Sequence, residues 1–105
     1  MNVKDEVKEL LKKYSRENIV FSNHAEIRII QRQIEKEEII ENLLNPKRLE
    51  IAIRQESNKY ECYFTYINTR CHKYVIVLLN NLIIVTVMKI NRRWQKIAEK
   101  KARKN

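Results

Sequence analysis

The chain has 105 residues, of which 44% are apolar and 33% charged, and its formal net charge is +9. This composition excludes a disordered chain, and the length allows one domain with one core. Glycine is absent, which excludes phosphate-binding loops that depend on it. The longest apolar run, Leu82 to Met88, which is broken by Thr86, is far too short to cross a bilayer.

The first part of the chain is predicted to be helical. Apolar residues recur at helical spacing over residues 3–14, which predicts an amphipathic helix. Ser22 is a good N-cap for a second helix from Asn23 to about Gln33. A third helix is expected over Glu37 to Leu44, ending before Pro46, because proline disfavours helical geometry in the residue that precedes it.

After the proline the apolar pattern changes to a period of two. Leu49 to Arg54 and Tyr60 to Tyr66 alternate as strands do, and two continuous apolar runs, Tyr74 to Leu79 and Leu82 to Met88, are typical of central strands. Asn80-Asn81 is expected to join these runs in a tight hairpin, since asparagine tolerates positive φ.

Arg92 to about Arg103 is predicted to be a final basic helix with Trp94, Ile97 and Ala98 turned inward. The order predicts an α+β domain, with N-terminal helices packed on a four-stranded antiparallel sheet and a basic C-terminal helix. Residues 1–105 form one domain in this prediction, helical over 1–46, a β-meander over 47–90 and a basic helix over 91–105.

The positive charge is concentrated at the C-terminus. Residues 89–105 hold eight basic side chains and one acidic one, whereas the first 88 residues hold 14 basic and 12 acidic ones. Such a segment is expected to bind phosphate backbones, through Lys89, Arg92, Arg93, Lys96, Lys100 and Lys101. A solvated helix end is one alternative, and a surface for an acidic partner protein, anchored by Trp94, is another.

A second group of polar residues is expected on the second helix. His24, Arg28, Gln31 and Arg32 share one helical face, beside an apolar stripe of Ile27, Ile30 and Ile34 expected to seat the helix on the core. Periodicity alone is equally consistent with a solvated face. The functional interpretation is chemical, because metal-free RNA cleavage needs a group that moves the 2′-hydroxyl proton and cations that hold the phosphate.

The same stretch resembles a known family. Its residues Phe21, Ser22, His24, Ala25, Arg28, Arg32, Ile34, Ile39, Leu43, Asn45 and Pro46, with a late strand at Ile83 to Val87, resemble the family called domain of unknown function 4258 (DUF4258). The resemblance covers about residues 18 to 90. That family is similar to the RelE/BrnT-like toxins and to the barnase–EndoU–colicin–RelE ribonuclease fold.

This RelE-like resemblance implies a metal-independent endoribonuclease, usually a toxin restrained by a small antitoxin protein. It implies His24 as the general acid or base, Arg28 and Arg32 as phosphate clamps, and Thr86 as a hydroxyl presented by the last strand. The chain departs from the family at Gln33, where glycine is common, and this places the end of the helix in question.

His72 is a possible second catalytic group, although an exposed turn histidine is the plainer expectation. Arg70, Lys73 and Lys89 are further candidates for phosphate contacts if they lie on the same side of the sheet as His24.

Cys62 and Cys71 do not have the spacing of a zinc knuckle, so no metal or other cofactor is expected. The charged N-terminus does not resemble a signal peptide, which with two cysteines predicts reduced thiols in the cytosol. The tyrosines of the strands are expected in the core, with Tyr63 the one that could face outward and stack on bases.

These patterns predict a cytoplasmic protein with no membrane segment that binds RNA, and the resemblance implies that it is a toxin-type endoribonuclease. The alternatives are a nucleic-acid-binding module without chemistry and a protein-interaction domain that docks through its basic C-terminus.

Overall fold

The computed structural model describes residues 2–67, 69–91 and 93–104, and gives no side-chain placement at residues 97 and 102–104. Its helices are α1 (Val3–Leu11), α2 (Asn23–Arg32), α3 (Lys36–Leu44) and α4 (Gln95–Lys104). Its strands are β1 (Ile19–Phe21), β2 (Leu49–Glu56), β3 (Lys59–Ile67), β4 (Arg70–Leu78) and β5 (Leu82–Ile90). Short 3₁₀ turns, η1 (Arg16–Asn18) and η2 (Pro46–Arg48), precede β1 and β2.

The strands form one five-stranded mixed sheet in the order β1-β5-β4-β3-β2. Strands β2 to β5 make the expected antiparallel meander, which confirms the α+β class. The predicted four-stranded, wholly antiparallel sheet is wrong, because β1 adds a fifth strand that runs parallel to β5. Three residues are too few to show an alternating pattern, so this strand inside the supposedly helical residues 1–46 could not be read from periodicity.

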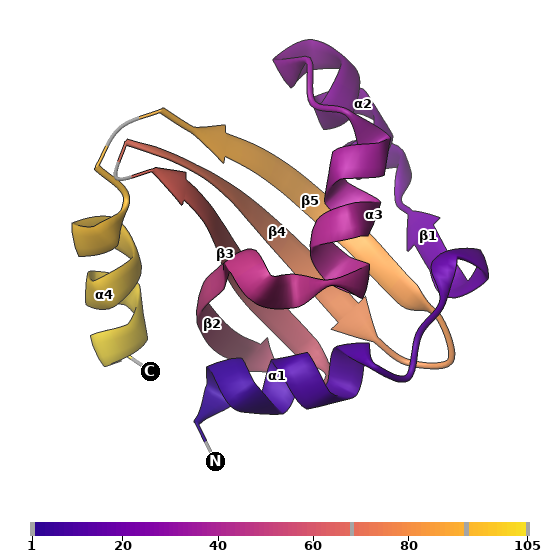
Figure 1. Cartoon of the computed structure of the whole chain (residues 1–105), viewed down its shortest axis with the longest axis horizontal. Coiled ribbons are helices and arrows are strands. Elements are labelled where there is room, and N and C mark those ends of the chain that lie inside the picture. The colour runs from indigo at the N-terminus through magenta and orange to yellow at the C-terminus, as the bar shows by residue number, and fades with distance from the viewer. Residues whose placement is uncertain (1, 68, 92, 105) are drawn as a thin grey trace.

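The sheet carries a separate apolar cluster on each face. The first contains buried side chains of α1, α2 and α3 with those of one side of the strands, and Figure 1 shows α1 and α3 lying across that side. The second, smaller cluster contains Trp94, which directly precedes α4, and Ala98 of α4, which pack on Ile53, Tyr63 and Ile90. The inward orientation of Trp94 and Ala98 is confirmed, and Ile97 lies outside the described side chains.

The N-terminal end of helix α2 is held to β5, and its C-terminal end is closed by Gln33. The Ser22 side chain accepts a hydrogen bond from the Ala25 amide, the predicted N-cap, and its hydroxyl donates to the Val85 carbonyl. Gln33 closes the helix in the left-handed conformation, at φ 52°, a position that glycine adopts more easily.

These contacts fix the rotation of α2 and overturn the predicted core stripe. Ala25 and Ile29 are buried, whereas Ile27 is 54% and Ile30 77% exposed. The apolar stripe was wrong because Ser22 is tied to β5, which turns the Ala25–Ile29 side of the helix toward the sheet. Of the three predicted isoleucines, only Ile34 is in the core.

Two single-methylene deletions test this rotation. Ile29→Val is expected to lower the free energy of unfolding by about 1 kcal/mol, because it removes buried apolar volume. Ile30→Val makes the same chemical change on the same helix at an exposed position, so its effect is expected to stay within about 0.3 kcal/mol. Urea unfolding of both variants measures the difference, and equal losses would mean that α2 is turned the other way.

The predicted turns are partly confirmed. Helix α3 ends at Leu44, and Asn45 before the proline is outside the helical region at φ −134° and ψ 77°. The β4–β5 hairpin closes with a hydrogen bond of 3.1 Å from the Leu79 amide to the Asn81 carbonyl, but the positive φ expected at Asn80-Asn81 is wrong. In the described ranges, the asparagine at positive φ is Asn58, in the β2–β3 turn.

Candidate functional site

The polar face of α2 is assembled as the sequence predicts. His24 is exposed, and its Nε2 accepts a hydrogen bond of 3.4 Å from Nε of Arg28. Arg28 Nη1 donates to Oε1 of Gln31 at 2.9 Å. The histidine and one arginine are therefore in contact at the protein surface, where a substrate could reach both.

The other two residues predicted for this site are placed differently. Arg32 is half-buried, and its Nη1 donates to the backbone carbonyl of Val87 at 2.6 Å, so the side chain ties α2 to β5. Thr86 pairs with Val75, and strand alternation places it on the opposite side of the sheet from Val87. The structure therefore does not bring the Thr86 hydroxyl to the face of His24.

A network of buried polar side chains lies between α3 and the sheet. His72 is only 3% exposed, and its Nδ1 lies 2.8 Å from the hydroxyl of Tyr74. Asn42 donates from Nδ2 to the hydroxyls of both Tyr66 and Tyr74, each at 2.9 Å. The expectation of an exposed turn histidine is wrong, because His72 is inside β4 and alternation turns it to the same side as Tyr74.

Glu38 connects this network to the surface. Its Oε1 lies 3.9 Å from Nε2 of His72, and its carboxylate contributes to a raised pKa of the Tyr66 hydroxyl, for which burial is the larger cause. The pKa of His72 is lowered, chiefly by burial, while Glu38 opposes the change and Lys89 and Arg70 add to it. His72 is therefore held in its neutral form among charged neighbours.

Cations gather around the outer edge of this network. The guanidinium of Arg48 lies 4.6 Å from the centre of the Tyr66 ring, and that of Arg70 lies 5.2 Å from it. Lys89 is the partner of His72 in the neighbouring strand, which puts it on the same side of the sheet. None of the three forms an ion pair with a described residue, so the edge has a surplus of positive charge.

The lowered pKa of His72 predicts a pH dependence of stability. The His72 ring of the unfolded chain binds a proton near pH 6.5, where the ring of the folded chain does not. The contribution of neutral His72 to the free energy of unfolding is therefore complete above pH 6.5 and is lost as the pH falls through the pKa of the folded state. Wild-type protein is therefore expected to lose stability between pH 7.5 and 5.5. His72→Gln should reduce this loss of stability, whereas His24→Gln should leave the part of the loss that His72 causes unchanged. Urea unfolding at both pH values measures the free energy of unfolding of each variant.

The opposite face of the sheet holds a second charged cluster. Glu61, 3% exposed, accepts hydrogen bonds from Tyr63 at 2.5 Å and from Gln55 at 2.7 Å. The ammonium groups of Lys101 and Lys73 lie 3.2 and 3.5 Å from the same carboxylate. Burial alone would raise the pKa of Glu61, but the Tyr63 hydroxyl and the two lysines outweigh it, and the pKa is lowered.

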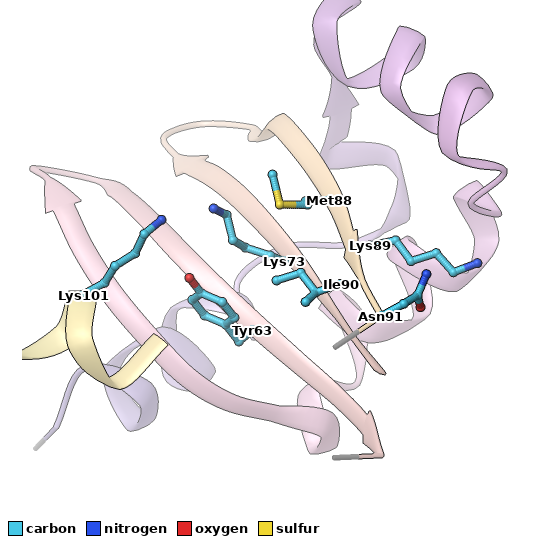
Figure 2. Close-up of a pocket in the computed structure, with 7 residues that line it drawn as sticks. All are labelled: Tyr63, Lys73, Met88, Lys89, Ile90, Asn91 and Lys101. Atoms are coloured by element: carbon cyan, nitrogen blue, oxygen red, sulfur yellow. The ribbon is translucent and has the colours of Figure 1, made fainter. Parts of the chain in front are cut away.

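An open cavity of about 480 Å³ adjoins this cluster, between α4 and β5. Figure 2 shows the side chains of Lys73 and Lys101 converging above Tyr63, while Lys89 points away from them. Lys89 also lines this cavity, but strand pairing puts it on the face of His72, whereas Lys73 lies on the α4 face. Tyr63 is fully buried, so the prediction that it faces outward is wrong: its ring stacks on Trp94, with 6.2 Å between ring centres.

The basic C-terminal segment is a docked helix. Trp94 donates from Nε1 to the Ile67 carbonyl at 3.4 Å, and Lys101 is paired with Glu61. Arg93, Lys96 and Lys100 are exposed and remain candidates for phosphate contacts, whereas Arg92 lies outside the described residues.

The cysteines lie on opposite sides of the sheet. Cys62 belongs to the first apolar cluster and Cys71 to the second, and both are free. Burial raises the pKa of Cys71 to about 11, so this thiol is held protonated. Across the residues with described placement, no three histidine, cysteine or acidic side chains come together as metal ligands.

The sequence predicted the surface pair His24–Arg28 but not the two buried networks. The signal for both was strand alternation: Glu61 lies between apolar neighbours in β3, and His72 lies two residues from Tyr74 in β4. Alternation gives the face of a side chain, but not which helix covers that face.

No described helix is long and apolar enough to cross a membrane. Comparison with protein-family models, curated proteins and solved structures finds no match to this chain.

Proposed function

We propose that the protein is a metal-independent endoribonuclease that acts on RNA, as its resemblance to DUF4258 and the RelE-like toxins implies. The observation that supports this proposal is the contact between His24 and Arg28 on an exposed helix face. A histidine beside a cation is the minimum needed to move a proton and to hold a phosphate as its charge develops.

In the proposed reaction, His24 takes the proton of the 2′-hydroxyl, whose oxygen attacks the adjacent phosphorus. The P–O5′ bond breaks, which leaves a 2′,3′-cyclic phosphate, and the departing O5′ takes a proton from water to give the 5′-hydroxyl product. Since Arg28 donates to Nε2 of His24, a bound phosphate must draw the guanidinium away to free that nitrogen as the base. Arg32 acts in this scheme as a positioning residue, because it fixes α2 on β5.

The wider setting is consistent with an RNA-acting protein. The exposed cations of α4 add non-specific attraction to a phosphate backbone, which becomes weaker as salt rises. A cytosolic location, with two buried free thiols, and restraint by a small antitoxin protein belong to the same proposal.

The test is incubation of purified protein with end-labelled single-stranded RNA in EDTA. We expect fragments that end in 2′,3′-cyclic phosphate, at a rate that EDTA does not change. Fragments with 3′-hydroxyl ends, or cleavage abolished by EDTA, would contradict the proposed chemistry.

A second candidate is a nucleic-acid-binding module without chemistry, supported by the exposed cations on α4. Deletion of α4 is a poor test because it uncovers Tyr63 and Glu61, so exposed lysines are better targets. A module that binds through α4 would lose affinity for RNA in the variant Lys96→Gln/Lys100→Gln and would show no cleavage. Docking to a protein through Trp94 is not supported, since that side chain is only 2% exposed.

A further inference from the structure

The strongest unassigned feature is a group of cations around Tyr66 and His72, on the face of the sheet that α3 covers. This region is called the α3 end. Arg48 follows α3 in η2, Arg70 begins β4, and Lys89 lies near the end of β5. Their side chains are exposed, and within the described chain they have no acidic partner. The folding of three separate segments brings them around Tyr66 and His72.

We propose that Arg48, Arg70 and Lys89 form a binding site for the phosphate groups of a single-stranded nucleic acid, above the ring of Tyr66 and beside His72. This inference rests on the proposed function, because it assumes that the protein acts on RNA, and it names where the substrate backbone lies. Guanidinium groups match phosphate oxygens in pairs, which a lysine ammonium cannot do.

The Tyr66 ring prepares the site for an anion. Both guanidiniums lie over this one ring, which holds each of them in place by a cation–π contact. The tyrosine is itself fixed by Asn42, which donates to its hydroxyl. Cations that are positioned before binding lose little conformational entropy when the ligand arrives.

The charged cluster on the opposite face shows why the α3 end is favoured. There, Lys73 and Lys101 share the carboxylate of Glu61, so much of their charge is already neutralised within the protein. At the α3 end the acid that acts on His72 is Glu38, whose Oε1 lies 3.9 Å from Nε2 of that neutral ring and forms no ion pair with Arg48, Arg70 or Lys89 within the described chain. A phosphate therefore gains more from the three cations here.

The titration of His72 can report whether a ligand binds at this site. The groups that face it are Glu38 from α3, Tyr66 from β3, Arg70 and Tyr74 from β4, and Lys89 from β5, with Arg48 beyond the Tyr66 ring. A bound phosphate offsets the positive charges of Arg70 and Lys89, which favours the protonated imidazole. By linkage, the ligand should then bind more tightly as the pH falls through the His72 titration.

The experiment is a titration followed by NMR of the histidine rings, with hexauridylate that carries 2′-O-methyl groups and therefore cannot be cleaved. We expect the His72 signals to shift, and the ring pKa to rise, on binding. Arg48→Gln/Arg70→Gln should weaken binding by roughly tenfold or more. The control Lys12→Gln/Lys13→Gln removes the same charge from exposed positions next to α1, outside any proposed site, and should weaken binding less than about threefold. Inorganic phosphate should cause the same His72 shift at lower affinity.

Equal losses in the two double variants, or a ligand that leaves the His72 signals unchanged, would overturn the proposed site. Binding of inorganic phosphate without binding of the oligonucleotide would overturn the nucleic acid as its ligand. Because the probe cannot be cleaved, these results do not depend on catalysis: binding here by a protein that cleaves no RNA contradicts the endoribonuclease alone. Cleavage of RNA at unchanged KM in Arg48→Gln/Arg70→Gln contradicts the site alone.

Discussion

Replacement of His24 by alanine is expected to slow RNA cleavage by about 10²- to 10⁴-fold, the usual contribution of a general base. The imidazole is exposed and touches Arg28, so its removal takes away the proposed proton acceptor without opening a cavity in the core. The folded state should be unaffected, with urea unfolding within about 0.5 kcal/mol of wild type. Single-turnover cleavage of labelled RNA in EDTA measures the effect.

The matched control is Ile27→Ala, which truncates an exposed apolar side chain on the same helix, beside the polar face but with no proposed role in the reaction. It should cleave RNA at the wild-type rate. An unchanged rate in His24→Ala would remove His24 from the reaction and leave His72 as the other histidine of the chain to test. A lower rate with unchanged RNA affinity would place the effect of His24 on the chemical step.

Replacement of Glu61 by alanine is expected to lower the free energy of unfolding by about 3 kcal/mol, because it leaves a buried ammonium without its counter-charge. Lys73, Tyr63 and Gln55 all lose their partner at once. The effect should be near the lower end of the usual range, since burial already lowers the pKa of Lys73 and a neutral amine costs less to keep buried. Urea unfolding at pH 7 measures the loss.

Two variants separate this cause from a general weakening of the sheet. Glu50→Ala removes an exposed carboxylate from β2 and should change stability by less than about 0.5 kcal/mol. The double variant Glu61→Ala/Lys73→Met removes both charges and should recover part of the loss. A loss that is the same with and without Lys73→Met would show that the ion pair is not the cause.

The lowered pKa of Glu61 also sets the direction of its pH dependence. The stabilising contribution is complete above the ordinary carboxyl pKa, about 4.5, and is lost as pH falls through the lower folded value. The difference in free energy of unfolding between wild type and Glu61→Ala should therefore become smaller at acidic pH.

Much of the fold follows from local patterns in the sequence. Helical spacing, the Ser22 cap, the Asn45-Pro46 stop and the alternation of the strands predicted three N-terminal helices, four of the strands and the final helix. These features depend on residues that are close together in the chain, so they can be predicted directly from the sequence. The contact between His24 and Arg28 belongs to the same class, since residues four apart on a helix are adjacent.

The sequence by itself determined the α+β class, the antiparallel meander, the basic C-terminus and the polar face of α2. Only the tertiary structure decided that β1 joins β5, that Ile30 faces outward and Ile29 inward, and that α4 docks through Trp94 over Glu61. It alone also gathered Arg48 and Arg70 around Tyr66. The physical reason is that each of these outcomes depends on partners far apart in the chain, and periodicity describes only which side of an element a residue is on.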